Sequence, residues 1–218
     1  MEIIMSFFDV ARELLFAFGQ NTIIFAATLV GAIPLGFIIM FGSTSRWKPI
    51  RAVVKTIVWV IRGTPLMLQL FIVQFGPGIM FNIPMRQRMV STLIAFIINY
   101  AAYFSEIFRG GLESIPRGQY EAGQVLGMTG RQIFSKIVLF QVIKRITAPM
   151  GNEIITLIKD TSLARTIAVV EILRTAEIYS AKGYIGPLFY TAVYFLVFVG
   201  VLTVIFNKLE KKMDYYSG

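Results

Sequence analysis

The sequence predicts an all-α integral membrane protein that crosses the bilayer five times. Of its 218 residues, 56% are hydrophobic and 15% are charged, and the mean hydropathy is +0.70. Soluble domains usually carry about 25% charged residues, so this chain is much less polar than they are. It also contains several uncharged runs of about the twenty residues that a helix needs to cross a bilayer. The alternating polarity that is typical of membrane β-barrels does not occur.

The residue types exclude several classes of function. The chain has no cysteine and no histidine, which removes disulfides, thiol nucleophiles, zinc sites and imidazole acid–base catalysis. It has no glycine loop that ends in Gly-Lys-Ser or Gly-Lys-Thr, the usual nucleotide-binding loop. The net charge of +9 could indicate nucleic acid, but basic loops on the cytoplasmic side of a membrane explain it better. We therefore expect no catalytic residue, no metal and no nucleic-acid partner.

The first element expected is a short interfacial helix within residues 1–18, with Ser6, Asp9 and Glu13 on its polar face. No basic region precedes the first apolar residues, so a cleaved signal peptide is not expected. The uncharged run that follows predicts a first span over Ile23–Met40.

The second hydrophobic region, Ala52–Phe75, is interrupted by Arg62-Gly63-Thr64-Pro65. Thr64 suits an N-cap and Pro65 the first helical position, so a new helix is expected to start there. Within the bilayer, its free N–H groups would face an anionic group such as a carboxylate. Alternatively, Ala52–Ile61 lies on the cytoplasmic surface and the span begins at Pro65. The sequence leaves both possibilities open.

Three further helices complete the expected single transmembrane domain, residues 1–218. The third span is Met89–Phe108, the fourth helix follows residue 136, and the last span is Gly186–Phe206.

Loops of different character separate these helices. Glycine and proline at 76–84 predict an external loop before the third span. Residues 109–136 form a polar interruption that is too polar to enter lipid, and residues 161–186 form a charged, partly helical external loop.

Basic residues predict an orientation with the N-terminus outside and the C-terminus inside. With the polar interruption in the cytoplasm, thirteen of the 21 basic residues lie inside: Arg46, Lys48, Arg51, Lys55, Arg109, Arg117, Arg131, Lys136, Lys144, Arg145, Lys208, Lys211 and Lys212. Seven lie outside: Arg12, Arg86, Arg88, Lys159, Arg165, Arg174 and Lys182.

The fourth helix carries charges that a membrane helix would normally avoid. Glu153 and Asp160 are two helical turns apart and share a face, and Asn152 and Lys159 form a second such pair on an adjoining stripe. An acidic residue near the bilayer centre costs about 2.5–3.5 kcal/mol, so it usually faces a pathway or a partner. Two carboxylates in a cavity would favour a cationic substrate such as arginine, lysine or histidine. Alternatively, Glu153 pairs with a neighbouring helix and Asp160 lies at the outer surface.

The third span adds Asn99, which could hydrogen-bond either a zwitterion or another helix. In the same span, Glu106 is expected to pair with Arg109 across one turn. The residues predicted to contact a substrate are therefore Glu153, Asp160, Asn99, Asn152 and Lys159.

The most specific motif lies in the polar interruption. Pro116, Gly118 and Gly130 bracket one short helix, and Gly127 at its end predicts a sharp turn. The segment resembles the cytoplasmic coupling motif of ABC importer permeases, which reads Glu-Ala-Ala, three residues, Gly, nine residues and Ile-x-Leu-Pro. The matching residues are Glu121, Ala122, Gly127, Ile137 and Leu139, and the departures are Gly123 for the second Ala and Phe140 for the Pro.

Other stretches resemble the polar amino-acid branch of these permeases, and together they span residues 15–212. They are Arg62-Gly63-Thr64-Pro65-Leu66, Gln69-Leu70-Phe71, Ala102-Tyr103-Phe104-Ser105-Glu106-Ile107-Phe108-Arg109-Gly110, Ile115-Pro116-Arg117-Gly118-Gln119 and Gly151-Asn152-Glu153-Ile154-Ile155-Thr156-Leu157-Ile158-Lys159-Asp160-Thr161-Ser162-Leu163.

The resemblance implies a type I ABC importer permease of the bacterial cytoplasmic membrane that moves a polar amino acid by alternating access. It implies an ABC ATPase subunit in two copies that holds Mg-ATP, a second permease copy or paralogue, and an extracytoplasmic amino-acid-binding protein. This chain would then be surrounded by lipid, hold no cofactor and not be an enzyme. Glu121, Ala122, Gly123 and Gly127 would couple it to the ATPase.

Two other functions remain open at this point. An ion-coupled secondary transporter could use Glu153 or Asp160 as its ion site, although the chain leaves little room for two inverted repeats. A membrane scaffold or receptor would leave the carboxylates of the fourth helix without a use.

Overall fold

The computed structural model describes residues 7–213, which form helices joined by short links. The helices are α1 (Phe7–Ser43), α2 (Lys48–Gly63), α3 (Leu66–Phe81), α4 (Arg88–Glu113), α5 (Arg117–Val125), α6 (Gly130–Ile133), α7 (Leu139–Asp160), α8 (Ile172–Ser180) and α9 (Gly186–Lys212). A π-helical turn, Phe134–Val138, joins α6 to α7, and a 3₁₀ helix, Thr161–Ile167, follows α7.

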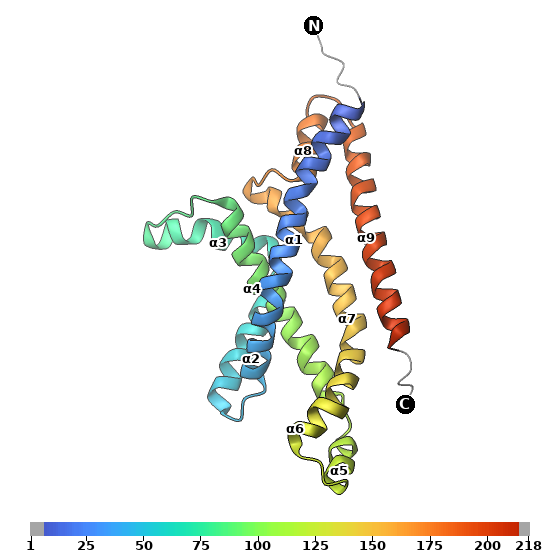
Figure 1. Ribbon diagram of the computed structural model, residues 1–218. Helices are drawn as coiled ribbons and strands as arrows, with labels where there is room; N and C mark the ends of the chain where they lie inside the picture. Colours follow the sequence, from blue (N-terminus) through green and yellow to red (C-terminus); the bar gives the residue numbers. More distant parts are fainter. Residues whose placement is uncertain (1–6, 214–218) are drawn as a thin grey trace.

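The long helices run lengthwise through the molecule (Figure 1). Helix α1 packs mainly on α4, and α7 packs on both α4 and α9. The short helices α5 and α6 lie at one end, toward which α9 also runs, whereas α1 begins at the opposite end beside α8 (Figure 1). Helix α3 projects sideways from the bundle. The two ends of the described chain therefore lie on opposite sides of the molecule.

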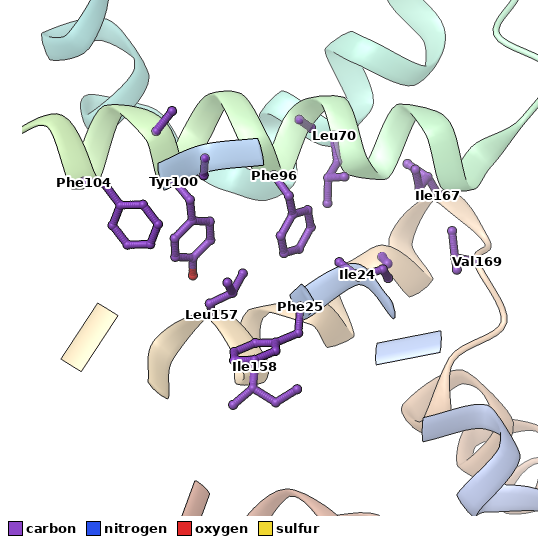
Figure 2. Close-up of a cluster of buried hydrophobic side chains, with 14 of the residues drawn as sticks. Ile24, Phe25, Leu70, Phe96, Tyr100, Phe104, Leu157, Ile158, Ile167 and Val169 are labelled. Carbon is purple, nitrogen blue, oxygen red and sulfur yellow. The ribbon is translucent and has the colours of Figure 1, made fainter. Parts of the chain in front are cut away.

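The core forms where α4 meets α1 and α7. Phe96, Tyr100 and Phe104 recur at intervals of four residues, so they lie on one face of α4, and each is at most 2% exposed. Their rings point toward the fully buried Leu157 of α7, and Phe25 of α1 and the buried Ile158 of α7 lie beyond it (Figure 2). This packing fixes the position of α7 relative to α4.

Three described helices are long and apolar enough to cross a membrane: α1, α4 and α9. The pair α2 and α3 passes the same test as one broken span that bends by 105°. Helix α7 occupies the place of the predicted fourth span, but its charged residues make it less apolar than a typical membrane-spanning helix. The segments predicted as spans are thus all helical.

The N-terminal part differs from the expected separate helix. Residues 7–18 form the first turns of α1, without a break before the predicted span. Gly19 is the sole helix-weakening residue there, and one glycine costs only about 1 kcal/mol. Phe18 is buried, with its ring 5.5 Å from that of Phe195 in α9. Residues 1–6, with the predicted Ser6 position, lie outside the described part.

The loop expected at 76–84 also begins later than predicted. Helix α3 continues through Pro77 to Phe81 and ends at Asn82, which has a φ of 56°. A single proline removes only one backbone hydrogen bond, and asparagine tolerates the left-handed conformation better than most residues. The stop signal was therefore Asn82 and not the glycines around Pro77.

A buried polar cluster fixes the end of the molecule near α8. The Asn21 amide of α1 donates to Thr161 Oγ1 at 2.9 Å and to Glu171 Oε2 at 3.0 Å, and it accepts from the Ile172 N–H at 3.1 Å. Burial raises the pKa of the Glu171 carboxyl, and the hydrogen bonds that it accepts from Asn21 and from the N–H groups of Leu173 and Arg174 partly offset that effect. Because Thr161 directly follows Asp160, the cluster also anchors the last turn of α7.

The crossing of α4 and α7 provides a test of the packing. A Cβ atom at Gly111 would collide with the Ile146 side chain, whereas one at the neighbouring Gly110 would meet nothing. We predict that Gly111→Ala destabilises the detergent-solubilised protein by about 1–3 kcal/mol. Gly110→Ala should be neutral or stabilising by up to about 1 kcal/mol, because alanine favours the helix. If thermal unfolding showed the same change in stability for both variants, the close approach of α4 and α7 at Gly111 would be contradicted.

Candidate functional site

A cavity of about 480 Å³ lies where the break between α2 and α3 faces α4 and α7. Its walls combine exposed backbone from the break with polar side chains from the two helices. The lining residues are Arg62, Gly63, Thr64, Pro65, Leu66, Asn99, Tyr100, Tyr103, Glu153, Thr156, Asp160 and Leu163.

The break follows from one proline. Pro65 restricts Thr64 to extended backbone, with φ −113° and ψ 143°, so α2 cannot continue. Pro65 is itself the N-cap and Leu66 the first residue of α3, one position later than predicted. Thr64 instead closes α2, because its hydroxyl donates to the Val60 carbonyl at 3.0 Å. The chain thus turns sharply and presents this segment to the cavity.

Two carboxylates enter the cavity from α7. Glu153, Thr156 and Asp160 are spaced by three and four residues, which places them on one helical face. The Tyr100 hydroxyl donates to Asp160 Oδ2 at 2.7 Å and so orients that carboxylate. Glu153 forms no hydrogen bond or ion pair with any residue that the structure describes. The cavity therefore contains one carboxylate that a hydrogen bond orients, that of Asp160, and one that can accept hydrogen bonds from a ligand, that of Glu153.

One basic side chain, that of Arg62, also lines the cavity. Its Nη1 is 3.6 Å from Glu106 Oε2, and its guanidinium lies 5.0 Å from the centroid of the Tyr103 ring. The predicted pairing of Glu106 with Arg109 is confirmed, with 2.6 Å between Arg109 Nη2 and Glu106 Oε2. Glu106 thus shares its charge between two arginines and leaves Arg62 partly available.

Three of the five residues predicted to contact a substrate line this cavity: Glu153, Asp160 and Asn99. Asn152 and Lys159 do not, because each lies one residue, or about 100°, around the helix from a carboxylate. Lys159 instead borders a second cavity of about 370 Å³, next to residues of α8 and α9.

Several residues of the cavity were not predicted from the sequence. Tyr103 lies four residues after Asn99, and Thr156 lies three residues after Glu153, so helical spacing could have identified both. The sequence did not identify Tyr100, because an aromatic residue in an apolar span usually belongs to the hydrophobic core.

The polar interruption folds into a compact projection at the end of the molecule (Figure 1). Helix α5 stops at Val125, and Gly127, with a φ of 72°, reverses the chain as predicted. The Met128 N–H donates to the Gly123 carbonyl at 3.0 Å, which closes the turn. At its tip, Val125 is 87% and Leu126 is 77% exposed. The projection therefore presents two adjacent apolar side chains on its outside.

Gly123 has a packing role within this chain. A Cβ atom on it would lie 2.6 Å from Ile133 Cγ1, so it allows α6 to pack on α5 within this chain. Glu121 and Ala122 are exposed and remain available to a partner. Thr129 and Gln132 form a reciprocal cap at the start of α6. The projection is therefore internally braced, and its outer surface includes Val125 and Leu126, which the sequence analysis did not single out.

Comparisons with known proteins agree with this arrangement. The family model of the binding-protein-dependent transport system inner membrane component matches residues 32–215. The chain is 36% identical over 190 residues to the L-cystine transport system permease protein TcyB of Bacillus subtilis (strain 168), covering 84% of this chain and 78% of that protein. It is 32% identical to the arginine transport system permease protein ArtQ of the same organism, covering 88% of this chain and 87% of ArtQ.

Among solved structures, the fold is similar to that of a chain from the crystal structure of an amino acid ABC transporter with histidines. The TM-score is 0.85 and the sequence identity 25%, and the match covers 96% of this chain and 100% of that one.

Proposed function

The chain belongs to the binding-protein-dependent transport system inner membrane components, and on that premise we propose that it carries basic amino acids such as arginine, lysine or histidine. The coarser statement is established: it is a multi-pass permease subunit of an amino-acid ABC importer in the cytoplasmic membrane. The names of its relatives include cystine, arginine and glutamine, so they do not select a substrate. The choice of a basic substrate rests on the cavity.

The observation that carries the proposal is the pair of carboxylates, Glu153 and Asp160, on the wall opposite the helix break. Two unit charges 4 Å apart interact by about 4 kcal/mol at an effective dielectric constant of 20, against about 1 kcal/mol in water. A cationic side chain would gain this interaction, and a neutral side chain would leave the carboxylates unpaired. Arg62 at the cavity edge would supply a counter-charge to the α-carboxylate that all amino acids share.

For the topology, we propose five spans: α1, the broken pair α2 and α3, α4, α7 and α9. Helix α7 can be a span despite its charges because its two carboxylates, Glu153 and Asp160, line the cavity. The excess of basic residues near α5, α6 and the end of α9 supports an orientation with the C-terminus inside and the N-terminus outside.

For the partners, we propose an ABC ATPase in two copies, a second copy or paralogue of this permease, and an external amino-acid-binding protein. The ATPase would hold Mg-ATP and contact the projection through Glu121, Ala122, Val125 and Leu126, while Gly127 keeps its turn tight. ATP binding would close the ATPase pair, move the projection and open the cavity outward, and hydrolysis would reset it. Membership of the family disfavours an ion-coupled secondary transporter.

A substitution at Gly127 tests the coupling role. Valine strains the left-handed backbone at Gly127 (φ 72°), whereas a Cβ atom at Gly118 in α5 meets nothing. We predict that Gly127→Val lowers transport per ATP hydrolysed by about tenfold or more in proteoliposomes that hold the complete importer, while membrane insertion is unchanged. Gly118→Val is the control and should transport almost normally. Normal transport per ATP by Gly127→Val would contradict the coupling role.

The substrate class is tested by neutralising the cavity. We predict that Glu153→Gln with Asp160→Asn weakens equilibrium binding of arginine to the permease–ATPase complex by about tenfold or more, which corresponds to about 1.4 kcal/mol. Glu210→Gln, near the end of α9 and away from the cavity, should leave binding unchanged. Undiminished arginine binding by the double variant would exclude these carboxylates as the recognition site.

A further inference from the structure

Gln69, in the first turn of α3, connects the helix break to the cavity. Its Nε2 donates to the Ile61 carbonyl at 2.8 Å, to Thr64 Oγ1 at 2.9 Å and to the Thr64 carbonyl at 3.2 Å. Its Oε1 accepts from Asn99 Nδ2 of α4 at 3.1 Å. One side chain thus contacts the end of α2 and a residue of the cavity wall.

The direction of these hydrogen bonds is fixed by the backbone. The carbonyls of Ile61 and Thr64 can only accept, so the amide nitrogen of Gln69 must face them and its oxygen must face Asn99. Asn99 must then donate with Nδ2, and its Oδ1 is turned the other way. Asn99 lines the cavity, and its Oδ1 accepts no hydrogen bond from a described residue.

The hydroxyl groups of the cavity are already committed as donors. Tyr100 donates to Asp160, Thr156 to the Asn152 carbonyl at 2.9 Å, Thr64 to the Val60 carbonyl, and Tyr103 to the Arg62 carbonyl at 3.5 Å. On the walls formed by α4 and α7, the groups that remain available to a ligand are therefore carboxylate and amide oxygens, which accept hydrogen bonds. Such walls suit a ligand that brings N–H donors and reject one that brings a carbonyl oxygen.

Gln69 also stabilises the break that forms the opposite wall. The last carbonyls of a helix have no partner within it, and in an apolar environment each unsatisfied group costs several kcal/mol. Gln69 donates to the Ile61 carbonyl in the last turn of α2, which also accepts from the Thr64 N–H at 3.4 Å, and to the Thr64 carbonyl just beyond the end of α2. The orientation of Asn99 is therefore linked to the geometry of the break.

We propose that Gln69 is a positioning residue for substrate specificity: it turns the Asn99 carbonyl oxygen into the cavity, where that oxygen joins Glu153 and Asp160 in recognising a guanidinium or ammonium group. The inference rests on the function proposed above. It adds a residue that does not line the cavity, and it states which end of the Asn99 amide faces the substrate. Arginine and citrulline separate the possibilities, because citrulline replaces one terminal nitrogen of arginine with a carbonyl oxygen.

The test measures equilibrium binding of arginine and of citrulline to the permease–ATPase complex in lipid nanodiscs, without the binding protein. We expect the wild type to bind arginine at least about tenfold more tightly. Gln69→Leu should reduce this ratio by about fivefold or more. The control is Gln74→Leu, because Gln74 is the second glutamine of α3 and donates to the Met85 carbonyl, away from the cavity. It should keep the wild-type ratio.

A second variant covers the case in which Gln69→Leu fails to fold. Asn99→Ala leaves the contacts of Gln69 with the break in place and should lose the same discrimination. The two substitutions together should lose no more than either alone, because both act through one oxygen atom.

The outcomes separate this inference from the proposed function. A wild type that binds citrulline as well as arginine would overturn the basic substrate and the role of Gln69 with it. A wild type that prefers arginine, with the full preference kept in Gln69→Leu and Asn99→Ala, would overturn the role of Gln69 alone.

Discussion

A helix can break inside an apolar segment only if the backbone groups that it frees find partners. In this chain Pro65 forces the break between α2 and α3. Most of the site follows from the way in which the backbone carbonyls at the break are hydrogen-bonded. Thr64 and Gln69 provide the donors, and Gln69 extends the network to Asn99 of α4. The space left beside the bend becomes a cavity, and the polar face of α7 closes it. Two of the charged residues that make α7 a poor membrane helix, Glu153 and Asp160, line this cavity.

The cavity lies beside the break between α2 and α3, and the projection is formed by α5 and α6, but the same two helices, α4 and α7, connect the two sites. Helix α4 carries Asn99 at the cavity and leads into α5, and α7 runs from the projection to Asp160. Between these sites α4 and α7 approach closely at Gly111 and Ile146. A displacement of the projection would therefore also displace α4 and α7, which form two walls of the cavity. Coupling between distant sites requires a contiguous structural connection of this kind.

Hydropathy predicted the positions of the long helices, and helical periodicity placed Glu153 and Asp160 on one face. Both patterns are local, so the sequence contains them. Periodicity could not say how far α7 is rotated about its axis, and Asn152 and Lys159 were therefore grouped with the carboxylates although they face elsewhere. Gln69 and Tyr100 act through partners on other helices, which no local pattern reveals. The role of Gly123 likewise depends on Ile133, which the turn at Gly127 brings back against α5.

The central claim is that the substrate passes through the cavity between the helix break and α7. The chain has no cysteine, so single cysteines report on chosen sites without background. The most direct measurement is the rate at which a thiol reagent labels Thr156→Cys in the cavity and Val125→Cys on the projection, with and without arginine. Protection of position 156 alone by arginine is the predicted result. Equal labelling of position 156 in the presence and absence of every basic amino acid would contradict the account.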